Sequence, residues 1–552
     1  MLTARPGPVI AWRADTRGPR GQPGASALTA IAPDGTRAAV ADAADTTRTA
    51  GQGLLYIAGA KIWFIVSAYA IYFVLPRLLG TPEAFGLYST AMSTVSILNN
   101  VLIAATVQTV SKLVSEDHDR AAVTLRQGLK IQLVVGTTVA GLLLLLAPYI
   151  AEGFLKDPAV TPLLRVCAAV VFSYSIYAAL VGSLNGRHLF SRQAGLDATF
   201  SALRTTGILG GAALGLGVIG AIGGFASAAV LILGAALVVV GVGKAGEQLP
   251  LQRWTSFMRP IWIYQAFLNG ILLIDVLVMK GTITDMAAET GVSTEEAIRI
   301  ANENVGYYSA AQKFAFVPYQ LMVSLTFIIF PMVSKATSEG DSARARETIR
   351  GALRFALLVL VSIAAPMAGA ADGVMLIAYP AEYLAGAGAL SVLVLGAAAF
   401  ALFVVSATAL SGAGRPGTAA AIAAIGLTAV VIGNRVLVKL AGLGEETLMA
   451  AATGTSSGMA LALLCAGYLV YRRFGAFLAP LTVLRVAMAG AVAWLAASNI
   501  PHDSRIMAIV ALAGGFFTFI VILVLLREAT GKDLQMVTNI LGRGKKKSAP
   551  KD

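Results

Sequence analysis

Apolar residues occur along most of the chain in long runs, and short polar segments that hold most of the charges separate these runs. A helix of about 20 apolar residues spans the roughly 30 Å hydrocarbon core of a bilayer. The pattern therefore predicts an all-α polytopic membrane protein with about fourteen transmembrane helices. We expect these helices at residues 54–76, 85–108, 129–150, 163–184, 200–218, 221–243, 257–280, 305–330, 351–371, 388–410, 418–439, 447–470, 481–499 and 505–526.

Two short sequences occur twice in the chain, which indicates an internal repeat. VSKLVSE at residues 110–116 returns as VSKATSE at residues 333–339, and GLYSTA at residues 86–91 returns as GYYSAA at residues 306–311. Each pair falls at equivalent places in the second and the eighth expected helices. The repeat therefore predicts two homologous six-helix lobes with a central cavity, related by an axis along the membrane normal.

The repeat divides the chain into five expected segments. Residues 51–250 are expected to form the N-lobe, residues 251–475 the C-lobe, and residues 476–530 two additional C-terminal helices. Residues 1–50 have no apolar run typical of a signal peptide, and their composition predicts a disordered cytoplasmic tail. Residues 531–552 are expected to form a basic cytoplasmic tail.

Composition and charge agree with a membrane protein and predict its orientation. The chain is 57% hydrophobic and 13% charged, and a soluble domain typically has about twice this charged fraction. The net charge of +13 comes from loops and the C-terminal tail rather than from one basic domain, so a nucleic-acid partner is not expected. If the N-terminus is cytoplasmic, about seventeen Lys and Arg residues lie in inner loops and about eight on the other side. Both termini are therefore expected in the cytoplasm.

Metal, cofactor and nucleotide sites are not expected. The two cysteines lie inside apolar runs, and the three histidines lie far apart in polar connections. GLGVIG at residues 215–220 has the spacing of a dinucleotide-binding loop, but it lies between two apolar spans without a βαβ unit. Gly207, Gly211 and Gly215 recur every four residues, so close packing between helices explains the glycines better.

A polar stripe follows one face of the second expected helix, and the repeat places a matching stripe on the eighth. The stripe consists of Ser89, Ser93, Ser96 and Asn100, and its counterparts are Ser309, Lys313, Phe316 and Gln320. Lipid cannot satisfy such groups, so they face either a wet cavity or a neighbouring helix to which they hydrogen-bond. Lys313 favours the cavity, because a buried ammonium costs at least about 2.5 kcal/mol unless it meets anions or water.

Three further ionisable residues fall near the membrane core. Lys61 in the first helix either reaches the cavity or extends to the inner interface, and Arg204 lies in the fifth helix. Asp275 in the seventh helix either pairs with a nearby lysine or binds a coupling cation.

Six tyrosines either offer faces for stacking on sugars or belong to the interfacial belt: Tyr69, Tyr72, Tyr264, Tyr307, Tyr308 and Tyr319. Cationic and neutral groups predominate, which suits an anionic substrate such as a pyrophosphate head group.

Short motifs in both lobes match a known family. They are LPRLLG at residues 75–80, FGLY at 85–88 and VSK at 110–112, then YSAA at 308–311, Pro318 and FPMVS at 330–334. Through these motifs the chain, over about residues 54–526, resembles the polysaccharide-exporter branch of the multidrug/oligosaccharidyl-lipid/polysaccharide (MOP) flippase superfamily. The resemblance implies two six-helix lobes around a V-shaped cavity, alternating access, and export of an undecaprenyl-pyrophosphate-linked oligosaccharide across the bacterial inner membrane.

The resemblance also implies partners and leaves related activities open. The implied partners are membrane lipid, a polymerase and a chain-length regulator, which take part in making lipopolysaccharide O-antigen or exopolysaccharide. The resemblance implies no catalytic residue and no cofactor. A multidrug or cation antiporter and a lipid II flippase are the alternatives. Lipid II flippases share an Arg-Asp pair in the first helix, where this chain has Lys61 and no acid. The multidrug branch typically has an acid in its N-lobe cavity, and the first two helices here provide none.

An enzyme is the alternative from a different class. Membrane glycosyltransferases, polymerases and ligases usually display acidic, Arg or His catalytic residues on a sizeable outer loop. The longest expected outer loop, residues 281–304, is short, acidic and helix-like, so it suits a lid or a solvated surface. The doubled lobes and the polar stripes also disfavour a structural scaffold.

Overall fold

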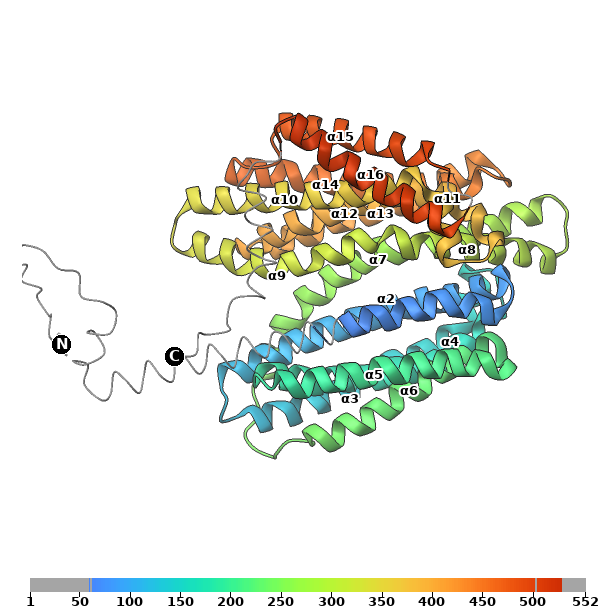
Figure 1. Ribbon diagram of the computed structural model, residues 1–552. Coiled ribbons are helices and arrows are strands. Elements are labelled where there is room, and N and C mark those ends of the chain that lie inside the picture. The colour runs from blue at the N-terminus through green and yellow to red at the C-terminus, as the bar shows by residue number, and fades with distance from the viewer. Residues whose placement is uncertain (1–58, 60–61, 502–503, 529–552) are drawn as a thin grey trace, which may run out of the picture. The chain divides into compact units, whose positions relative to one another are not determined.

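The computed structural model describes residues 59, 62–501 and 504–528, and within them the chain is helical with no β-strand (Figure 1). Twelve helices of this part are long and apolar enough to cross a membrane. The all-α membrane fold expected from the hydrophobic pattern is therefore confirmed. Lys61, residues 1–50 and residues 531–552 lie outside the described residues.

The N-lobe contains the helix Ile62–Leu79 and five further helices. These are α2 Pro82–Glu116, α3 Ala121–Pro148, α4 Val160–Gly186, α5 Phe190–Gly211 and α6 Gly217–Val240, with the π-helical turns η2 Tyr149–Phe154 and η3 Ala212–Leu216. The chain reverses between α5 and α6 at Gly215 and Gly217, whose φ angles are +77° and +59°. The apolar stretch from α5 to α6 therefore crosses the membrane twice.

Glycines bring α5 and α6 into close contact. Gly207 faces Gly224 and Gly211 faces Gly220, and a Cβ atom at any of these positions would overlap the neighbouring helix. Close packing, rather than nucleotide binding, is therefore the role of Gly207 and Gly211, whereas Gly215 serves the turn.

The C-lobe and the two additional helices make up the rest of the chain. Their elements are α7 Leu251–Glu289, α8 Thr294–Ala315, α9 Val317–Ser338, α10 Ser342–Gly369, α11 Ala371–Ala378, the 3-10 helix η4 Ala381–Gly386, α12 Ala387–Gly412, α13 Pro416–Ala441, α14 Thr447–Phe474, α15 Pro480–Asn499 and α16 Arg505–Leu525. The eighth expected helix is split at Phe316 into α8 and α9, and Pro318 lies in the first turn of α9. Counting this more polar pair as one crossing, and α5 and α6 as two, gives the fourteen crossings expected.

The expected outer loop at residues 281–304 is largely helical. α7 continues to Glu289 and α8 begins at Thr294, so only four residues connect them. Ser293 caps α8, because its side chain accepts a hydrogen bond from the backbone N–H of Glu296. The acidic residues of this segment therefore lie on helix surfaces rather than on a long loop.

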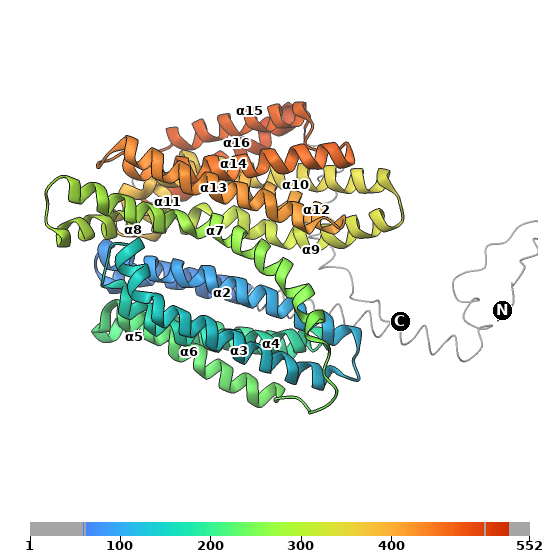
Figure 2. The ribbon, with the colours of Figure 1, turned by 180° about the vertical axis from the view of Figure 1, so that it is seen from behind.

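The repeated VSK sequences occupy equivalent positions at the C-terminal ends of α2 and α9, on the same end of the helices in both views (Figures 1 and 2). Lys112 forms an ion pair with Glu116 at 3.6 Å, and Lys335 forms one with Glu339 at 3.8 Å. Both pairs join residues four apart on one helix, and all four side chains are at least one-third exposed. The structure therefore gives the two lysines the same surface role.

Helix α2 lies at the contact between the two lobes. It packs against α4 inside the N-lobe and against α7 and α8 of the C-lobe (Figures 1 and 2). Large apolar side chains on outer helices are exposed, among them Val238 at 86%, Leu440 at 76% and Leu145 at 72%. Such a surface suits contact with lipid.

An ionic cluster attaches the two C-terminal helices to the C-lobe. The Glu528 carboxylate, just after α16, accepts hydrogen bonds from Arg354 of α10 at 3.1 Å and from Arg485 and Thr482 of α15 at 3.0 and 2.9 Å. Burial raises the pKa of Glu528, but the hydrogen bonds from Arg485, Thr482 and Arg354 outweigh this effect and leave the pKa below its usual value. The carboxylate is therefore charged at neutral pH and pairs with both arginines.

Candidate functional site

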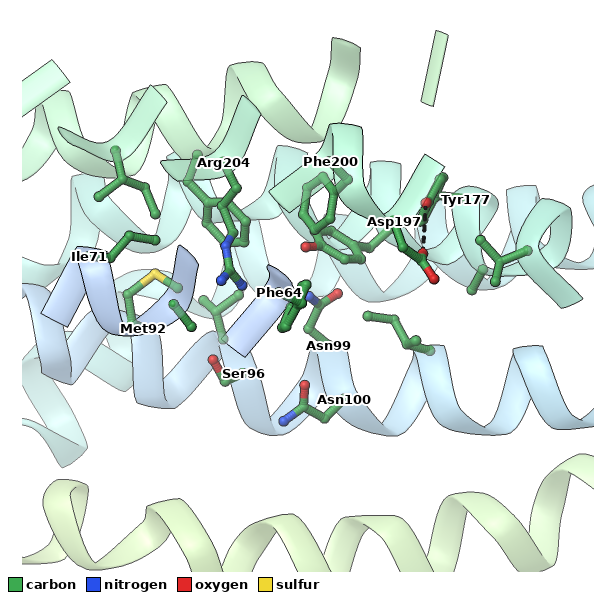
Figure 3. Close-up of a pocket in the computed structure, with 18 of the residues that line it drawn as sticks. Phe64, Ile71, Met92, Ser96, Asn99, Asn100, Tyr177, Asp197, Phe200 and Arg204 are labelled. Atoms are coloured by element: carbon green, nitrogen blue, oxygen red, sulfur yellow. Dashed lines mark hydrogen bonds between the residues drawn. The ribbon is translucent and has the colours of Figure 1, made fainter. Parts of the chain in front are cut away.

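A cavity of about 310 Å³ lies inside the N-lobe, between the helix Ile62–Leu79 and α2, α4, α5 and α6 (Figure 3). Seven of its 21 lining residues are aromatic, and the rings of Tyr88, Tyr174 and Phe200 among them are at least nine-tenths buried. Ligand sites for small molecules typically have volumes of about 300–1,000 Å³ and such walls, with a few polar groups. The cavity therefore has the size and character of a site for a small ligand.

Polar groups from opposite walls point into this cavity. Arg204 extends from α5 and Asn99 from α2 toward the same space (Figure 3). Arg204 Nε and Asn99 Oδ1 are buried and have no hydrogen-bond partner among the described residues. The Arg204 guanidinium lies over the ring of Phe64, 4.6 Å from its centroid, and forms no ion pair within the described part of the chain. A guanidinium in such a place favours an anion in the cavity.

The cavity also contains one carboxylate. Asp197, two helical turns before Arg204 on α5, accepts a hydrogen bond from the hydroxyl of Tyr177 at 3.3 Å (Figure 3). The first two helices contribute no acid, as expected, but the fifth does. The acidic content of the N-lobe cavity therefore does not by itself separate this chain from the multidrug branch.

Lys313 lies on the surface of the C-lobe that faces the N-lobe. Its ammonium is 5.3 Å from the ring centroid of Tyr72, and Tyr72 also lines the cavity. The hydroxyl of Tyr69 donates a hydrogen bond to the Lys313 carbonyl at 3.3 Å. No carboxylate forms an ion pair with Lys313 among the residues that the structure describes. Lys313 and Arg204 are therefore two cations that approach the same cavity from different lobes.

The expected polar stripe is divided between a cavity wall and helix contacts. Ser96 and Asn100 line the cavity, and Asn100 also donates a hydrogen bond to Asn269 Oδ1 of α7 at 2.9 Å. The rest of the stripe is placed differently: Ser89, Ser93 and Ser309 are buried, with exposed fractions of 4%, 4% and 1%, and Gln320 is exposed. The stripe therefore combines the two roles that its pattern left open.

Asp275 lies at the centre of a buried network in the C-lobe. Its carboxylate accepts hydrogen bonds from Tyr308 at 2.7 Å, from Gln312 at 3.0 Å and from Thr455 at 3.2 Å. The side-chain oxygens of Gln312 and Asn434, nearby in the network, are buried and find no partner in the part of the chain that the structure describes. Within the described chain no lysine or arginine pairs with Asp275, so the carboxylate has hydrogen-bond donors and free oxygens around it but no fixed countercharge.

A second buried cluster joins the lobes, and we name it the Lys280 cluster. Lys280 of α7 donates hydrogen bonds to Asp157 at 2.6 Å and to Asn302 of α8 at 2.7 Å, and Asn302 donates to Asp157 at 3.0 Å. Asp157 belongs to the turn between η2 and α4 of the N-lobe. The three side chains are at most 3% exposed. The cluster is therefore a fully desolvated ion pair across the two lobes, and Lys280 pairs with Asp157 rather than with Asp275.

Repeated glycines form a tight contact beside this cluster, which we name the glycine seam. A Cβ atom at Gly86 of α2 would overlap the carbonyl of Asn302, and a Cβ atom at Gly306 of α8 would overlap the carbonyl of Pro82. Gly86 and Gly306 are the first residues of the repeated GLYSTA and GYYSAA sequences. The repeat therefore marks the place where the two lobes touch backbone to backbone.

Sequence reasoning did not single out the residues of the Lys280 cluster or Asn99. Asp157 and Lys280 are far apart in the chain, and no motif links them. Asn99 is next to Asn100, but a face drawn through Ser89 and Ser93 excludes it. The cavity is lined by Met92, Asn99 and Ile103, on a face of α2 that only partly coincides with the stripe. Only the packing of α2 against its neighbours determines which face is free.

Solved structures of membrane transporters share the fold of this chain. A structure of the lipid II flippase MurJ in an inward closed conformation matches with a TM-score of 0.66 at 13% identity, over 86% of this chain and 99% of the other. An inward-facing multidrug resistance MATE family transporter matches with a TM-score of 0.59 at 15% identity, over 75% and 94%. The Vibrio cholerae MATE transporter VcmN in its bent form gives 0.52 at 16%, over 78% and 97%. Identities this low show a shared fold.

Sequence comparison then identifies the family. Residues 50–337 match the family model described as polysaccharide biosynthesis protein. This chain belongs to that polysaccharide biosynthesis protein family. No curated protein sequence matches it.

Proposed function

We propose that this protein is a flippase that moves an undecaprenyl-pyrophosphate-linked oligosaccharide across the bacterial inner membrane. The proposal rests on two cations, Arg204 in the N-lobe cavity and Lys313 beside it, neither of which forms an ion pair within the described part of the chain. Cations without countercharges in a membrane interior are costly unless an anionic ligand joins them. A pyrophosphate-linked sugar supplies the negative charge, and the family supplies the link to polysaccharide synthesis.

Contacts between the lobes support a mechanism of alternating access. The Lys280 cluster and the glycine seam close the lobes at the end where α8 begins. Both VSK lysines lie at the other end, which the positive-inside rule assigns to the cytoplasm together with both chain termini. With this orientation, we propose that the closed end faces the outside. Outward movement of the head group in an inside-negative membrane is favourable by about 2.3 kcal/mol per charge per 100 mV.

The proposed role places the protein between synthesis and polymerisation of a surface polysaccharide, such as O-antigen or exopolysaccharide. The lipid-linked oligosaccharide and membrane lipid are its direct partners, and a polymerase with its chain-length regulator uses the exported product. The protein itself performs no covalent chemistry in this proposal.

Replacing Lys313 by alanine is expected to reduce export about ten- to a hundredfold, since charge-assisted hydrogen bonds contribute about 1.5–3 kcal/mol. The measurement is surface polysaccharide in a flippase-deficient strain that expresses the variant at wild-type level. Lys313→Arg retains the charge and should export well. Lys335→Ala, which removes an exposed lysine paired with Glu339, is the matched control and should leave export unchanged. Normal export by Lys313→Ala would exclude this role.

We also propose that Asp275 couples transport to a proton or a monovalent cation. Its desolvated carboxylate has no countercharge among the described residues, and a bound cation or proton removes the cost of burying the charge. Asp275→Asn should therefore make transport into vesicles insensitive to the ion gradient and slow it by about tenfold or more, or about 1.4 kcal/mol. Asp372→Asn, a change at another acid of the C-lobe, is the control. If Asp275→Asn keeps the full response to both proton and sodium gradients, Asp275 has no part in coupling.

A further inference from the structure

We propose that the N-lobe cavity is a carbohydrate subsite for one acidic sugar, in which Arg204 binds the carboxylate of the sugar. The inference rests on the proposed function, because it names the part of the oligosaccharide that the cavity receives. Arg204, Asn99 and the aromatic walls supply the observations for it.

The charge around Arg204 suits a single carboxylate, because Asp197, the acid that also lines the cavity, lies two helical turns away on α5 and accepts a hydrogen bond from Tyr177. Arg204 is the one arginine or lysine among the described residues that line it, and the ring of Phe64 holds the guanidinium plane in position. Arginine binds a carboxylate through two parallel hydrogen bonds, and Nε is one of the donors that remain free here. A pyrophosphate has more charge than one guanidinium balances. Lys313, outside the cavity, is the better partner for the pyrophosphate.

The walls of the cavity suit a sugar ring. Sugars present C–H faces, which pack on aromatic rings, and hydroxyls, which need donors and acceptors at the rim. Tyr88, Tyr174 and Phe200 supply buried rings, and the unpartnered Oδ1 of Asn99 supplies an acceptor that points inward (Figure 3). A volume of about 310 Å³ is at the small end of ligand sites and fits one sugar unit rather than an oligosaccharide.

The cavity is also connected to the moving interface between the lobes. Asn100, one of its wall residues, donates a hydrogen bond to Asn269 of α7 at 2.9 Å. Tyr72, another wall residue, lies under the ammonium of Lys313. An acidic sugar in the cavity would therefore lie beside two contacts between the cavity wall and the C-lobe, one of which involves Lys313.

Ligand-observed NMR titration of the full-length protein in nanodiscs tests this subsite. The probes are methyl glucuronide, methyl glucoside and inorganic phosphate. Wild-type protein is expected to bind the glucuronide about ten- to a hundredfold more tightly than the glucoside, which is the range for a charge-assisted hydrogen bond. Arg204→Met should bind both sugars equally weakly, and Arg204→Lys should retain part of the preference. Lys335→Ala, which removes an exposed lysine paired with Glu339 at the end of α9, should keep the full preference.

Three results would overturn the subsite. They are equal binding of the two sugars by wild-type protein, no binding of the glucuronide, and tighter binding of phosphate than of the glucuronide at the same place. The preference is measured on wild-type protein, so it is informative even if an Arg204 variant fails to fold. Glucuronide binding without lipid translocation in vesicles would contradict the proposed function alone. Translocation without a glucuronide preference would contradict the subsite alone.

Discussion

Replacing Lys280 by methionine is expected to lower the free energy of unfolding by about 3–5 kcal/mol, which is the usual cost of leaving one charge of a buried pair without its partner. Lys280 and Asp157 are 0% and 1% exposed, so water does not screen the change. Asp157→Asn alone should be destabilising for the same reason, because it leaves the Lys280 ammonium buried. The measurement is thermal or denaturant unfolding of purified protein in one detergent.

The double variant Lys280→Met with Asp157→Asn separates charge from packing. It removes both charges, and replacing a whole buried pair is often neutral, so we expect it to regain most of the lost stability. Arg299→Met is the control, because it breaks the exposed ion pairs of Arg299 with Glu296 and Glu303 and should change stability little. A Lys280→Met variant as stable as the wild type would show that the cluster does not hold the lobes together.

Replacing Gly306 by leucine is expected to separate the lobes at the glycine seam and to stop most transport. The added side chain would meet the backbone of Pro82, which cannot move away as a flexible side chain does. Overpacking costs about 1–3 kcal/mol and sometimes more, so a cost near 3 kcal/mol would shift the equilibrium between closed and open states by roughly 150-fold. In the proposed transport cycle this contact is present only in the closed state, so the main effect expected is on the population of states.

Spin labels at Glu152→Cys and Glu295→Cys report this shift, because both positions are exposed and belong to different lobes. The distance distribution between the labels should move to longer values in Gly306→Leu and in Gly86→Leu. Gly141→Leu in α3 is the matched control, since a Cβ atom there meets nothing within 4 Å. Unchanged distances together with normal export would show that the seam does not close the transport path.

The helices and lobes are predictable from the sequence because both depend on local patterns. Apolar runs of membrane length define the crossings, and the repeated GLYSTA and VSK sequences align the lobes. The pattern is weaker where polar residues interrupt it. The α8–α9 crossing contains Lys313 and is interrupted at Phe316. It begins eleven residues before the expected start at 305, because Ser293 caps a helix that extends beyond the apolar run.

The site is only partly predictable, because it depends on which helices meet. Lys313 is recognisable as an ammonium inside an apolar span, and Asp275 as a carboxylate inside another. The pairing of Lys280 with Asp157 joins positions 123 residues apart and has no local signal. Arg204 lies in a glycine-rich span, and its role depends on the rotation of α5 that the close contact with α6 imposes.

Transport of the lipid itself tests the central claim most directly. Purified protein is reconstituted into vesicles with a fluorescent undecaprenyl-pyrophosphate-linked sugar in one leaflet, and a membrane-impermeant quencher follows its arrival in the other. We expect the protein to accelerate translocation over protein-free vesicles, to leave the mass of the sugar chain unchanged, and to lose most of this activity in Lys313→Ala. Translocation no faster than in protein-free vesicles, or conversion of the sugar into a longer chain, would contradict the account.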